Sequence, residues 1–372
     1  MQVSLAHARL SAVVLLAAVA SPALADNCAA DLDQNGAVDA VDLARILDDW
    51  GPCFGKCSSD INGDGTVGAP DLAALLAAWG PCGLPWATVL EQAPNPAVVT
   101  DPALRAAIAA SGLPWRVRHD ATQIEMLLVP AGTFEMGCTP GSIHTCSFYE
   151  QPVHAVTLSQ PFYLGRYEVT QAQWTALTGS NPSEFQDASA EVPASQVPSR
   201  PVEQVSWDMI QSALKTTDLR LPTEAEWEYA YRAGTTTAYH SMPGFPNGTS
   251  DYNLLTNISW NYITGSANCT TGSACQPRPV GLLAANALGF HDMSGNVSEW
   301  VYDFFGLDYY AQSPSVDPVG PADGFGGYRT RRGGSWGYAP GLERASARDF
   351  GNPSQGYNFV GLRVVRSVDG TP

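Results

Sequence analysis

Apolar residues follow three different patterns along the 372-residue chain. Residues 10–20 form a run of 11 residues near the amino end that is apolar except for Ser11. Residues 43–50 and 72–79 place apolar side chains at positions i, i+3, i+4 and i+7, which is typical of one face of a helix. From residue 124 onward, short apolar stretches alternate with turns, which predicts short strands and a few helices. We therefore expect more than one structural unit, and about 150 residues per domain gives two or three.

The first apolar run predicts a secretory signal peptide over residues 1–25. Arg9 precedes the run, and Ala23-Leu24-Ala25 has the small-x-small pattern of a cleavage site. The run is too short to cross a bilayer, which takes about 20 residues of helix, and no later stretch is long and apolar enough for a membrane span. We therefore expect a secreted protein, extracellular or periplasmic, in which disulfides can form.

Residues 28–82 contain an internal repeat. The segments 28–53 and 57–82 both begin with cysteine, and both end in Trp-Gly-Pro-Cys. Each carries acidic and amide side chains at alternating positions followed by glycine, which is the spacing of a calcium-binding loop. One such sequence is compatible with an ordinary Asx turn, but two copies in register favour calcium. The expected ligands are Asp31, Asp33, Asn35, Ala37, Asp39 and Asp42 in the first loop, and Asp60, Asn62, Asp64, Thr66 and Asp71 in the second, with Ala37 and Thr66 acting through their carbonyl oxygens.

A helix is predicted after each loop, because residues 43–50 and 72–79 carry matching apolar stripes that can pack on each other. This gives a small all-α module over residues 26–83, which resembles a dockerin. The resemblance implies calcium-dependent docking to a cohesin-like module of another protein. A purely structural calcium clip is the alternative. The residues expected to face the partner are Ala40, Val41, Ala69 and Pro70.

Residues 84–123 are rich in Ala, Pro and Val, and we predict a linker there with one short helix beginning beside Asp101. A large domain is expected to follow, over residues 124–368. Alternating apolar positions predict its first strands, and hydroxyl side chains ahead of apolar helical patterns predict its first helices. The predicted strands lie at residues 124–137, 153–158 and 161–169, and the predicted helix N-caps are Thr170, Ser206 and Thr223, the last in a capping box with Glu226.

Seven short sequences occur in one order along the large domain, at residues 129–137, 167–174, 201–207, 220–230, 289–300, 332–336 and 361–366. Among them are Arg220-Leu-Pro-Thr-Glu-Ala-Glu-Trp and Arg332-Gly-Gly-Ser-Trp. Each alone is weakly specific, but together they resemble the formylglycine-generating enzyme family, also called sulfatase-modifying factors. The resemblance implies a mixed α+β domain with much irregular backbone, distantly like C-type lectin folds.

The catalytic cysteines of that family have no counterpart in this chain. The resemblance implies that active members convert a substrate cysteine to formylglycine with oxygen, through two cysteines that bind copper shortly after the Arg-Gly-Gly-Ser-aromatic turn. The last cysteine here is Cys275, which precedes the turn at residues 332–336. Neither Tyr338 nor Glu343, which follow the turn, can replace a thiolate ligand of copper(I). Copper is therefore not expected as a cofactor.

The positions of the histidines exclude an iron site on a single helix. A related branch of the family binds non-heme iron through a histidine-rich helix. The six histidines of this chain lie at positions 7, 119, 144, 154, 240 and 291, and no two are closer than ten residues. A single helix therefore cannot supply an iron-binding set here.

Calcium is expected in the large domain as well. The resemblance implies two sites built from carboxylate, amide and backbone oxygens, which suit a hard cation, although the second lacks a clear downstream carboxylate. The alternative is that Asp292 is an ordinary turn acid and Glu299 a solvated helix acid. The expected ligands are Asp292, Gly295, Val297 and Glu299 at the first site, and Asn257 and Ile258 at the second.

All eight cysteines are expected in disulfides, because the protein is predicted to be exported. Cys138 and Cys146 bracket a polar turn, and so do Cys269 and Cys275, which favours a short-loop disulfide at each. A redox role is the alternative, but the sequence places no lysine nearby to lower a thiol pKa. The remaining cysteines are Cys28, Cys53, Cys57 and Cys82 in the repeat.

Charge bears on the partners of the protein. The formal net charge is −17 and the chain has only two lysines, so it lacks the cationic surface that nucleic acid requires. Arginines near the Arg-Gly-Gly-Ser-Trp turn are suited to line a groove for a peptide or a glycan. The alternative is that they pair with the surplus acids. The candidate groove residues are Arg332, Ser335, Trp336, Tyr338, Arg344 and Arg348.

Three functions are consistent with these features. We favour a secreted, non-catalytic binding or scaffold module that is tethered by the calcium-loop repeats. The first alternative is an active formylglycine-generating oxidase, or another oxidoreductase on the same scaffold. The second is a component of an extracellular polysaccharide-degrading assembly, which rests on the dockerin resemblance alone.

Overall fold

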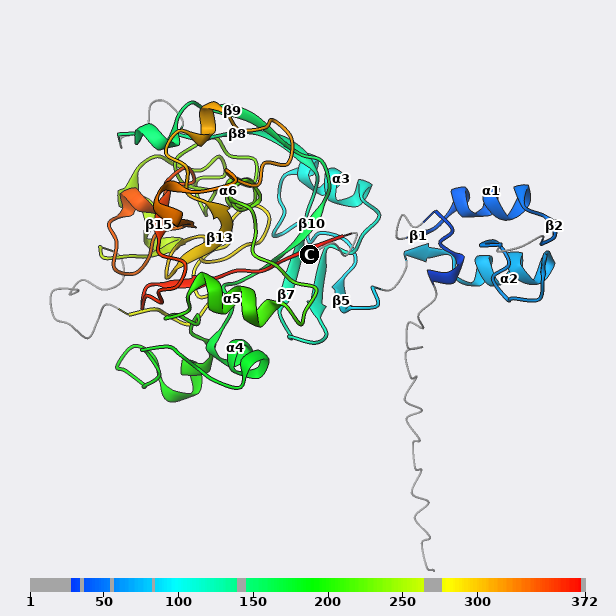
Figure 1. Cartoon of the computed structure of the whole chain (residues 1–372), viewed down its shortest axis with the longest axis horizontal. Coiled ribbons are helices and arrows are strands. Elements are labelled where there is room, and N and C mark those ends of the chain that lie inside the picture. The colour runs from blue at the N-terminus through cyan, green and yellow to red at the C-terminus, as the bar shows by residue number, and fades with distance from the viewer. Residues whose placement is uncertain are drawn as a thin grey trace, which may run out of the picture.

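The computed structural model describes residues 28–33, 37–53, 57–81, 84–138, 145–263 and 276–368. The predicted signal peptide, Asn35, Cys82, Cys269 and Cys275 lie outside the described residues, as do the side chains of Cys28 and Ala37. Figure 1 shows the repeat module in blue, and the large domain in cyan to red. None of the described helices is long and apolar enough to cross a membrane.

The repeat module, residues 28–81, consists of two loop-helix units joined by short antiparallel strand pairs. In each unit, a strand in the loop pairs with a strand that follows the helix of the other unit. The two predicted helices are confirmed, and Figure 1 shows them next to each other. The module is not all-α, because the pairs add four short strands. The elements are η1 (Cys28–Ala30), β1 (Ala37–Val38), α1 (Ala40–Asp48), β2 (Gly51–Pro52), β3 (Thr66–Val67), α2 (Ala69–Ala77) and β4 (Gly80–Pro81).

Only half of each predicted apolar stripe is buried in the repeat module. Ile46 and Leu75 are fully buried and belong to one small core. The disulfide Cys53–Cys57 links the two units. Such a small core stabilises a module of this size only weakly. The stripe residues that remain about half exposed are Leu47, Trp50, Leu76 and Trp79.

The first sheet of the large domain has five antiparallel strands in the order β17-β10-β7-β6-β5. Two of these strands and the helix α3 come from residues 84–123, so the prediction of a linker there is wrong. Trp115 and Val117 from this segment lie buried in the main core. The short helix predicted beside Asp101 is confirmed as α3, and the Asp101 side chain caps it. The elements are β5 (Ala87–Glu91), α3 (Pro102–Ala110), β6 (Arg116–His119), β7 (Glu125–Val129), β10 (Phe162–Gly165) and β17 (Val365–Ser367).

The second sheet has four strands in the order β15-β14-β13-β16, in which β13 and β16 are parallel and the other pairs antiparallel. The hairpin of β8 and β9 and the parallel pair of β11 and β12 complete the strands described here. The predicted strands at residues 124–137 and 153–158 are confirmed, and the one predicted at 161–169 is confined to β10. The elements are β8 (Gly132–Met136), β9 (His154–Leu158), β11 (Ser259–Trp260), β12 (Ser294–Gly295), β13 (Ser298–Phe304), β14 (Arg329–Arg332), β15 (Asp349–Gly351) and β16 (Val360–Leu362).

Three predicted helices begin at their predicted caps, which confirms a mixed α+β domain. The hydroxyl oxygens of Thr170, Ser206 and Thr223 each accept a hydrogen bond from the backbone N–H three residues later. The third helix, α6, packs against both β8 and β13, and it buries Glu224 and Glu228. The helical elements are α4 (Gln171–Thr178), α5 (Trp207–Leu214), α6 (Glu224–Arg232), η2 (Phe148–Glu150), η3 (Ala194–Ser199), η4 (Tyr252–Asn257), η5 (Tyr309–Ala311), η6 (Phe325–Gly327) and η7 (Pro340–Leu342).

Candidate functional site

The turn of residues 333–336 follows directly after β14. Gly333 and Gly334 both have positive φ, at 91° and 68°. A Cβ atom on Gly334 would lie 2.6 Å from Cγ of Glu343. The turn therefore requires glycine for its conformation and for its close contact with Glu343.

Two of the predicted groove residues reach the surface at this turn. Trp336 is half-buried, and its ring lies edge-on to Phe185 with 5.5 Å between centroids. Tyr338 is also half-buried, 5.2 Å from Phe359. Ser335, in contrast, is fully buried. The surface here is therefore aromatic rather than cationic.

Glu343 lies completely inside the domain. Its Oε2 accepts hydrogen bonds from Ser259 Oγ at 2.7 Å and from Asn261 Nδ2 at 2.9 Å. Its Oε1 has no hydrogen-bond partner among the described residues. Burial raises the pKa of the Glu343 carboxyl to about 8, so that it is mostly uncharged at neutral pH.

The arginines predicted to line a groove are buried in ion pairs, so that part of the groove prediction is wrong. Arg348 donates through Nε and Nη2 to the two carboxylate oxygens of Glu224, at 2.7 and 2.8 Å. Arg332 donates through Nη2 to Glu228. The alternative, that these arginines pair with surplus acids, is what the structure shows. The bidentate pair of Arg348 with Glu224 and the single ion-pair hydrogen bond of Arg332 to Glu228 offset the cost of burying the two carboxylates of α6.

Arg344 is also buried, beside a disulfide. Its Nη1 and Nη2 donate to the two oxygens of Glu150, at 2.8 Å each, and Ser346 donates to the same carboxylate. The predicted disulfide Cys138–Cys146 is confirmed, and Sγ of Cys138 lies 3.5 Å from Nη1 of Arg344. A cation does therefore lie beside this sulfur. The sequence could not reveal it, since the two residues are 206 positions apart.

The first predicted calcium loop brings three carboxylates together. Asp31, Asp33 and Asp42 each place an oxygen within 4.8 Å of the others. Asp42 is fully buried, and its Oδ1 accepts from the backbone N–H of Leu32 at 2.6 Å. Asp39 instead caps α1, since its side chain accepts from the N–H of Val41. Three of the predicted ligands thus lie close together, whereas the side chain of Asp39 caps the helix α1.

The second loop is held by backbone donors. Asp71 is fully buried and accepts from Asn62 N at 3.1 Å and Gly68 N at 2.8 Å. Burial opposes ionisation, but these backbone N–H groups outweigh it and lower the pKa of Asp71. Asp60 Oδ1 accepts from the N–H of Asp64. The remaining predicted residues of the module, all exposed, are Thr66 in the loop and Ala40, Val41, Ala69 and Pro70 in the first turns of α1 and α2.

A comparison with known families decides the relationship of the large domain. The family described as "Sulfatase-modifying factor enzyme 1-like domain" matches residues 115–368. The chain belongs to this family. The match begins near β6, which agrees with the inclusion of that strand in the first sheet.

Relatives in the sulfatase-modifying factor family include enzymes. The chain is 34% identical over 178 residues to the formylglycine-generating enzyme of Streptomyces coelicolor, covering 46% of this chain and 54% of that enzyme. It is 26% identical over 290 residues to the hercynine oxygenase of Mycolicibacterium smegmatis, covering 65% and 61%. The chain therefore spans just over half the length of each of these two relatives.

Solved structures show the same fold. The structure of PvdO from Pseudomonas aeruginosa is 28% identical, with a TM-score of 0.53, and the match covers 66% of this chain and 95% of that one. Treponema denticola variable protein 1 is 25% identical, with the same TM-score and coverage. Both matches are consistent with the family assignment.

The residues after the turn of this sulfatase-modifying-factor domain do not fit copper(I). Tyr338 and Glu343 offer oxygen atoms, and the carboxyl of Glu343 is buried and hydrogen-bonded within the protein. Copper(I) prefers soft sulfur ligands. Residues 276–372 contain no cysteine, and Cys138 and Cys146 are joined in a disulfide.

The predicted calcium ligands Asp292 and Glu299 have separate partners. Glu299 accepts from Nη2 of Arg363 at 2.9 Å and from Nε1 of Trp227 at 2.8 Å. Asp292 Oδ2 accepts from the N–H of Gly281 at 2.6 Å, and its Oδ1 has no hydrogen-bond partner among the described residues. One buried carboxylate oxygen is thus open to a cation, whereas the Glu299 carboxylate is already paired with a guanidinium.

Glu168 is a buried acid at this place that sequence reasoning missed. Its oxygens accept from Asn296 Nδ2 at 2.6 Å and from Val297 N at 3.0 Å. Burial, and then the carboxylates of Asp292 and Glu299, raise the pKa of Glu168 well above its ordinary value. Burial likewise raises the pKa of Asp292 to about 6. The sequence offered one signal for a buried acid here, because Glu168 lies between Tyr167 and Val169.

The other backbone positions predicted as ligands are already constrained. Gly295 has positive φ, and a Cβ atom there would lie 2.5 Å from the carbonyl oxygen of Trp260. The carbonyl oxygen of Asn257 accepts from Ala284 N at 2.8 Å. Ile258 is fully buried. At the second predicted site, Ile258 is therefore packed in the interior, and the Asn257 carbonyl oxygen already accepts a hydrogen bond.

Proposed function

We propose that the large domain is a non-oxidising binding module of the sulfatase-modifying factor family, and that the repeat module tethers it through calcium. The proposal that the domain does not oxidise cysteine is supported by the burial and protonation of Glu343. An uncharged, buried carboxylic acid lies after the Gly-Gly turn, where soft thiolate ligands would be needed for copper-dependent oxidation. The chain keeps the scaffold around this acid, including its hydrogen bonds to Ser259 and Asn261.

The surface beside the turn is suited to recognition. Trp336 and Tyr338 are half-buried, with Phe185 and Phe359 against them. Aromatic side chains supply large contact areas at low entropic cost. The charged groups nearby are paired in the interior, so they stabilise the fold that presents this aromatic face. A peptide or a glycan is the class of ligand that such a face accommodates.

A peptide oxidation assay tests the non-oxidising half of the proposal. The full chain, incubated with copper, oxygen and a Cys-x-Pro-x-Arg peptide, is expected to give no aldehyde by mass spectrometry, because the soft ligands are missing. The Streptomyces coelicolor enzyme under the same conditions is the positive control. Formation of formylglycine by this chain, above a reaction without protein, would overturn the proposal.

The tethering half rests on the geometry of the two loops. Asp31, Asp33 and Asp42 converge in the first loop, and their repulsion calls for a bound cation. The second loop carries the same spacing and a buried acid, Asp71. The half-exposed apolar residues of α1 and α2 leave a surface for a partner, and a cohesin-like protein is the partner that the resemblance favours.

Substitution of a loop acid tests calcium binding. Asp42→Asn in the full chain is expected to remove one of two bound calcium ions, or to weaken it at least about tenfold, because a charged ligand is lost. The measurement is a calorimetric calcium titration. Asp48→Asn, in the same helix but exposed and outside the loop, is the matched control and should leave both sites intact. Equal titrations of all three proteins would refute the first site.

A further inference from the structure

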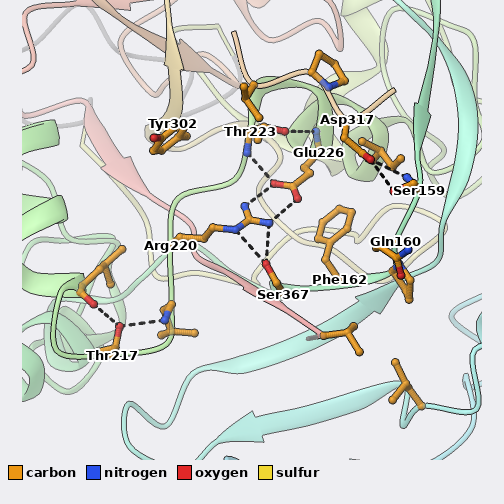
Figure 2. A pocket seen from close by; sticks show the side chains of 18 of the residues that line it. Ser159, Gln160, Phe162, Thr217, Arg220, Thr223, Glu226, Tyr302, Asp317 and Ser367 are labelled. Carbon is orange, nitrogen blue, oxygen red and sulfur yellow. Dashed lines mark hydrogen bonds and ion pairs between the residues drawn. The ribbon is translucent and has the colours of Figure 1, made fainter. Parts of the chain in front are cut away.

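A cavity of about 1150 Å³ lies in the large domain, away from the turn of residues 333–336. Its walls come from the β9–β10 connection, the end of α5, the start of α6 and the end of β17. Figure 2 shows the Arg220–Glu226 pair and Ser367 at its centre, with Gln160 and Thr217 on opposite sides. The volume exceeds the roughly 300–1,000 Å³ of typical small-molecule pockets. The cavity therefore has room for several linked chemical units.

Of the four charged residues on the cavity wall, Arg220 and Glu226 form an ion pair with each other. Arg220 donates to both oxygens of Glu226, at 2.7 Å each, and also to Ser367 Oγ. The carboxylate of Asp317 accepts from both the backbone N–H and the hydroxyl of Ser159, at 2.8 and 2.6 Å. With Lys215 at the wall, the four charged lining residues sum to zero. In a chain of net charge −17, this neutral wall disfavours a strongly charged ligand.

Uncharged polar groups on the cavity wall are within reach of a ligand. Gln160 is exposed and Gln211 is half-buried, and their amides make no hydrogen bond with the other described residues. Each amide offers both donors and an acceptor. The ring of Tyr302 is 43% exposed at the same wall. Phe162 at the same wall is only 3% exposed, whereas Val319 is 55% exposed.

We propose that this cavity binds an uncharged oligosaccharide. Hydroxyl groups would exchange hydrogen bonds with the amides of Gln160 and Gln211, and the apolar face of a sugar ring would lie on Tyr302. An anionic chain is disfavoured because Arg220 is saturated by Glu226 and Ser367. Apolar side chains such as Val319 also line the wall, so an apolar peptide is the competing ligand that the titrations below distinguish from a sugar. The cavity is separate from Glu343, so its occupancy does not depend on whether the domain oxidises cysteine.

Calorimetric titration of the full chain with cellohexaose, xylohexaose and mannohexaose tests the proposal. At least one of these neutral hexasaccharides is expected to bind, and Gln160→Ala and Tyr302→Ala are each expected to weaken that binding about tenfold, since each removes one contact worth about 1.4 kcal/mol. Phe148→Ala removes a more exposed aromatic ring outside the cavity and should leave the affinity unchanged.

Two outcomes with the neutral sugars would overturn this assignment. One is the absence of binding by all three hexasaccharides at millimolar concentration. The other is binding that persists unchanged in both Gln160→Ala and Tyr302→Ala, which would place the sugar elsewhere. Tri-galacturonate and an acetylated leucine-rich hexapeptide are titrated in parallel, and a preference for either over the neutral sugars would also reject the proposed class. The aldehyde assay is independent of all these results.

Discussion

Replacing Arg348 by methionine is expected to lower the free energy of unfolding of the large domain by about 3–5 kcal/mol. Arg348 is fully buried, and it makes a bidentate ion pair with Glu224 and donates to the carbonyl oxygens of Tyr149 and Gly306. Methionine fills much of the volume but leaves the Glu224 carboxylate without its cation. Asp303 lies close to the Glu224 carboxylate. Burial is the main cause that raises the pKa of Asp303 well above its ordinary value, and the negative charge of Glu224 is the next. The measurement is urea unfolding followed by tryptophan fluorescence.

Two further variants distinguish the effect of breaking the buried ion pair from the effect of removing any arginine. Glu224→Gln combined with Arg348→Met should recover part of the loss, because no uncompensated carboxylate remains. Arg116→Met removes a guanidinium that is paired with Glu91 and Glu125 at the surface, and should cost about 1 kcal/mol or less. A cost for Arg348→Met as small as that of Arg116→Met would contradict the structure and favour the groove predicted from the sequence.

Local chemistry explains what could be predicted from the sequence. Thr170, Ser206 and Thr223 cap their helices because a side-chain oxygen three residues ahead of an N–H needs no distant partner. The spacing of the acids in residues 31–42 is local for the same reason, and the structure places Asp31, Asp33 and Asp42 close together. The family assignment depended on seven such short sequences in order, and the comparison confirmed it.

Distant pairing explains what could not be predicted. Arg348 and Glu224 are 124 residues apart, and Arg344 and Glu150 are 194 apart. No spacing rule relates such positions, so surface and interior arginines look alike in the sequence. The same holds for the segment 84–123, where strand pairing with β7 turns an Ala- and Pro-rich stretch into part of the first sheet. Glu168 escaped notice because its partners lie about 130 residues further on, at Asn296 and Val297.

The replacement of Glu343 by glutamine is expected to make stability less dependent on pH. Burial raises the pKa of Glu343 to about 8 in the folded protein, from an ordinary value of 4.5. The folded state therefore keeps a proton that the unfolded state releases between these values. Stability falls by about 1.4 kcal/mol for each pH unit across this window. Glutamine does not titrate, so the variant should gain stability over the wild type as pH rises, by up to about 5 kcal/mol at pH 8.

Unfolding by urea from pH 4.5 to pH 8.5 measures this difference directly. The stability curves of the two proteins should lie closest at the acidic end and separate steadily toward pH 8, above which the gap becomes constant. Glu135→Gln, at an exposed position on β8, is the control for removal of a glutamate from the same domain. A gap that stays constant, or one that narrows as pH rises, would mean that Glu343 is ionised in the fold. The acid after the Gly-Gly turn would then be a charged group in the fold, although an ionised carboxylate is still a hard oxygen ligand that copper(I) does not prefer.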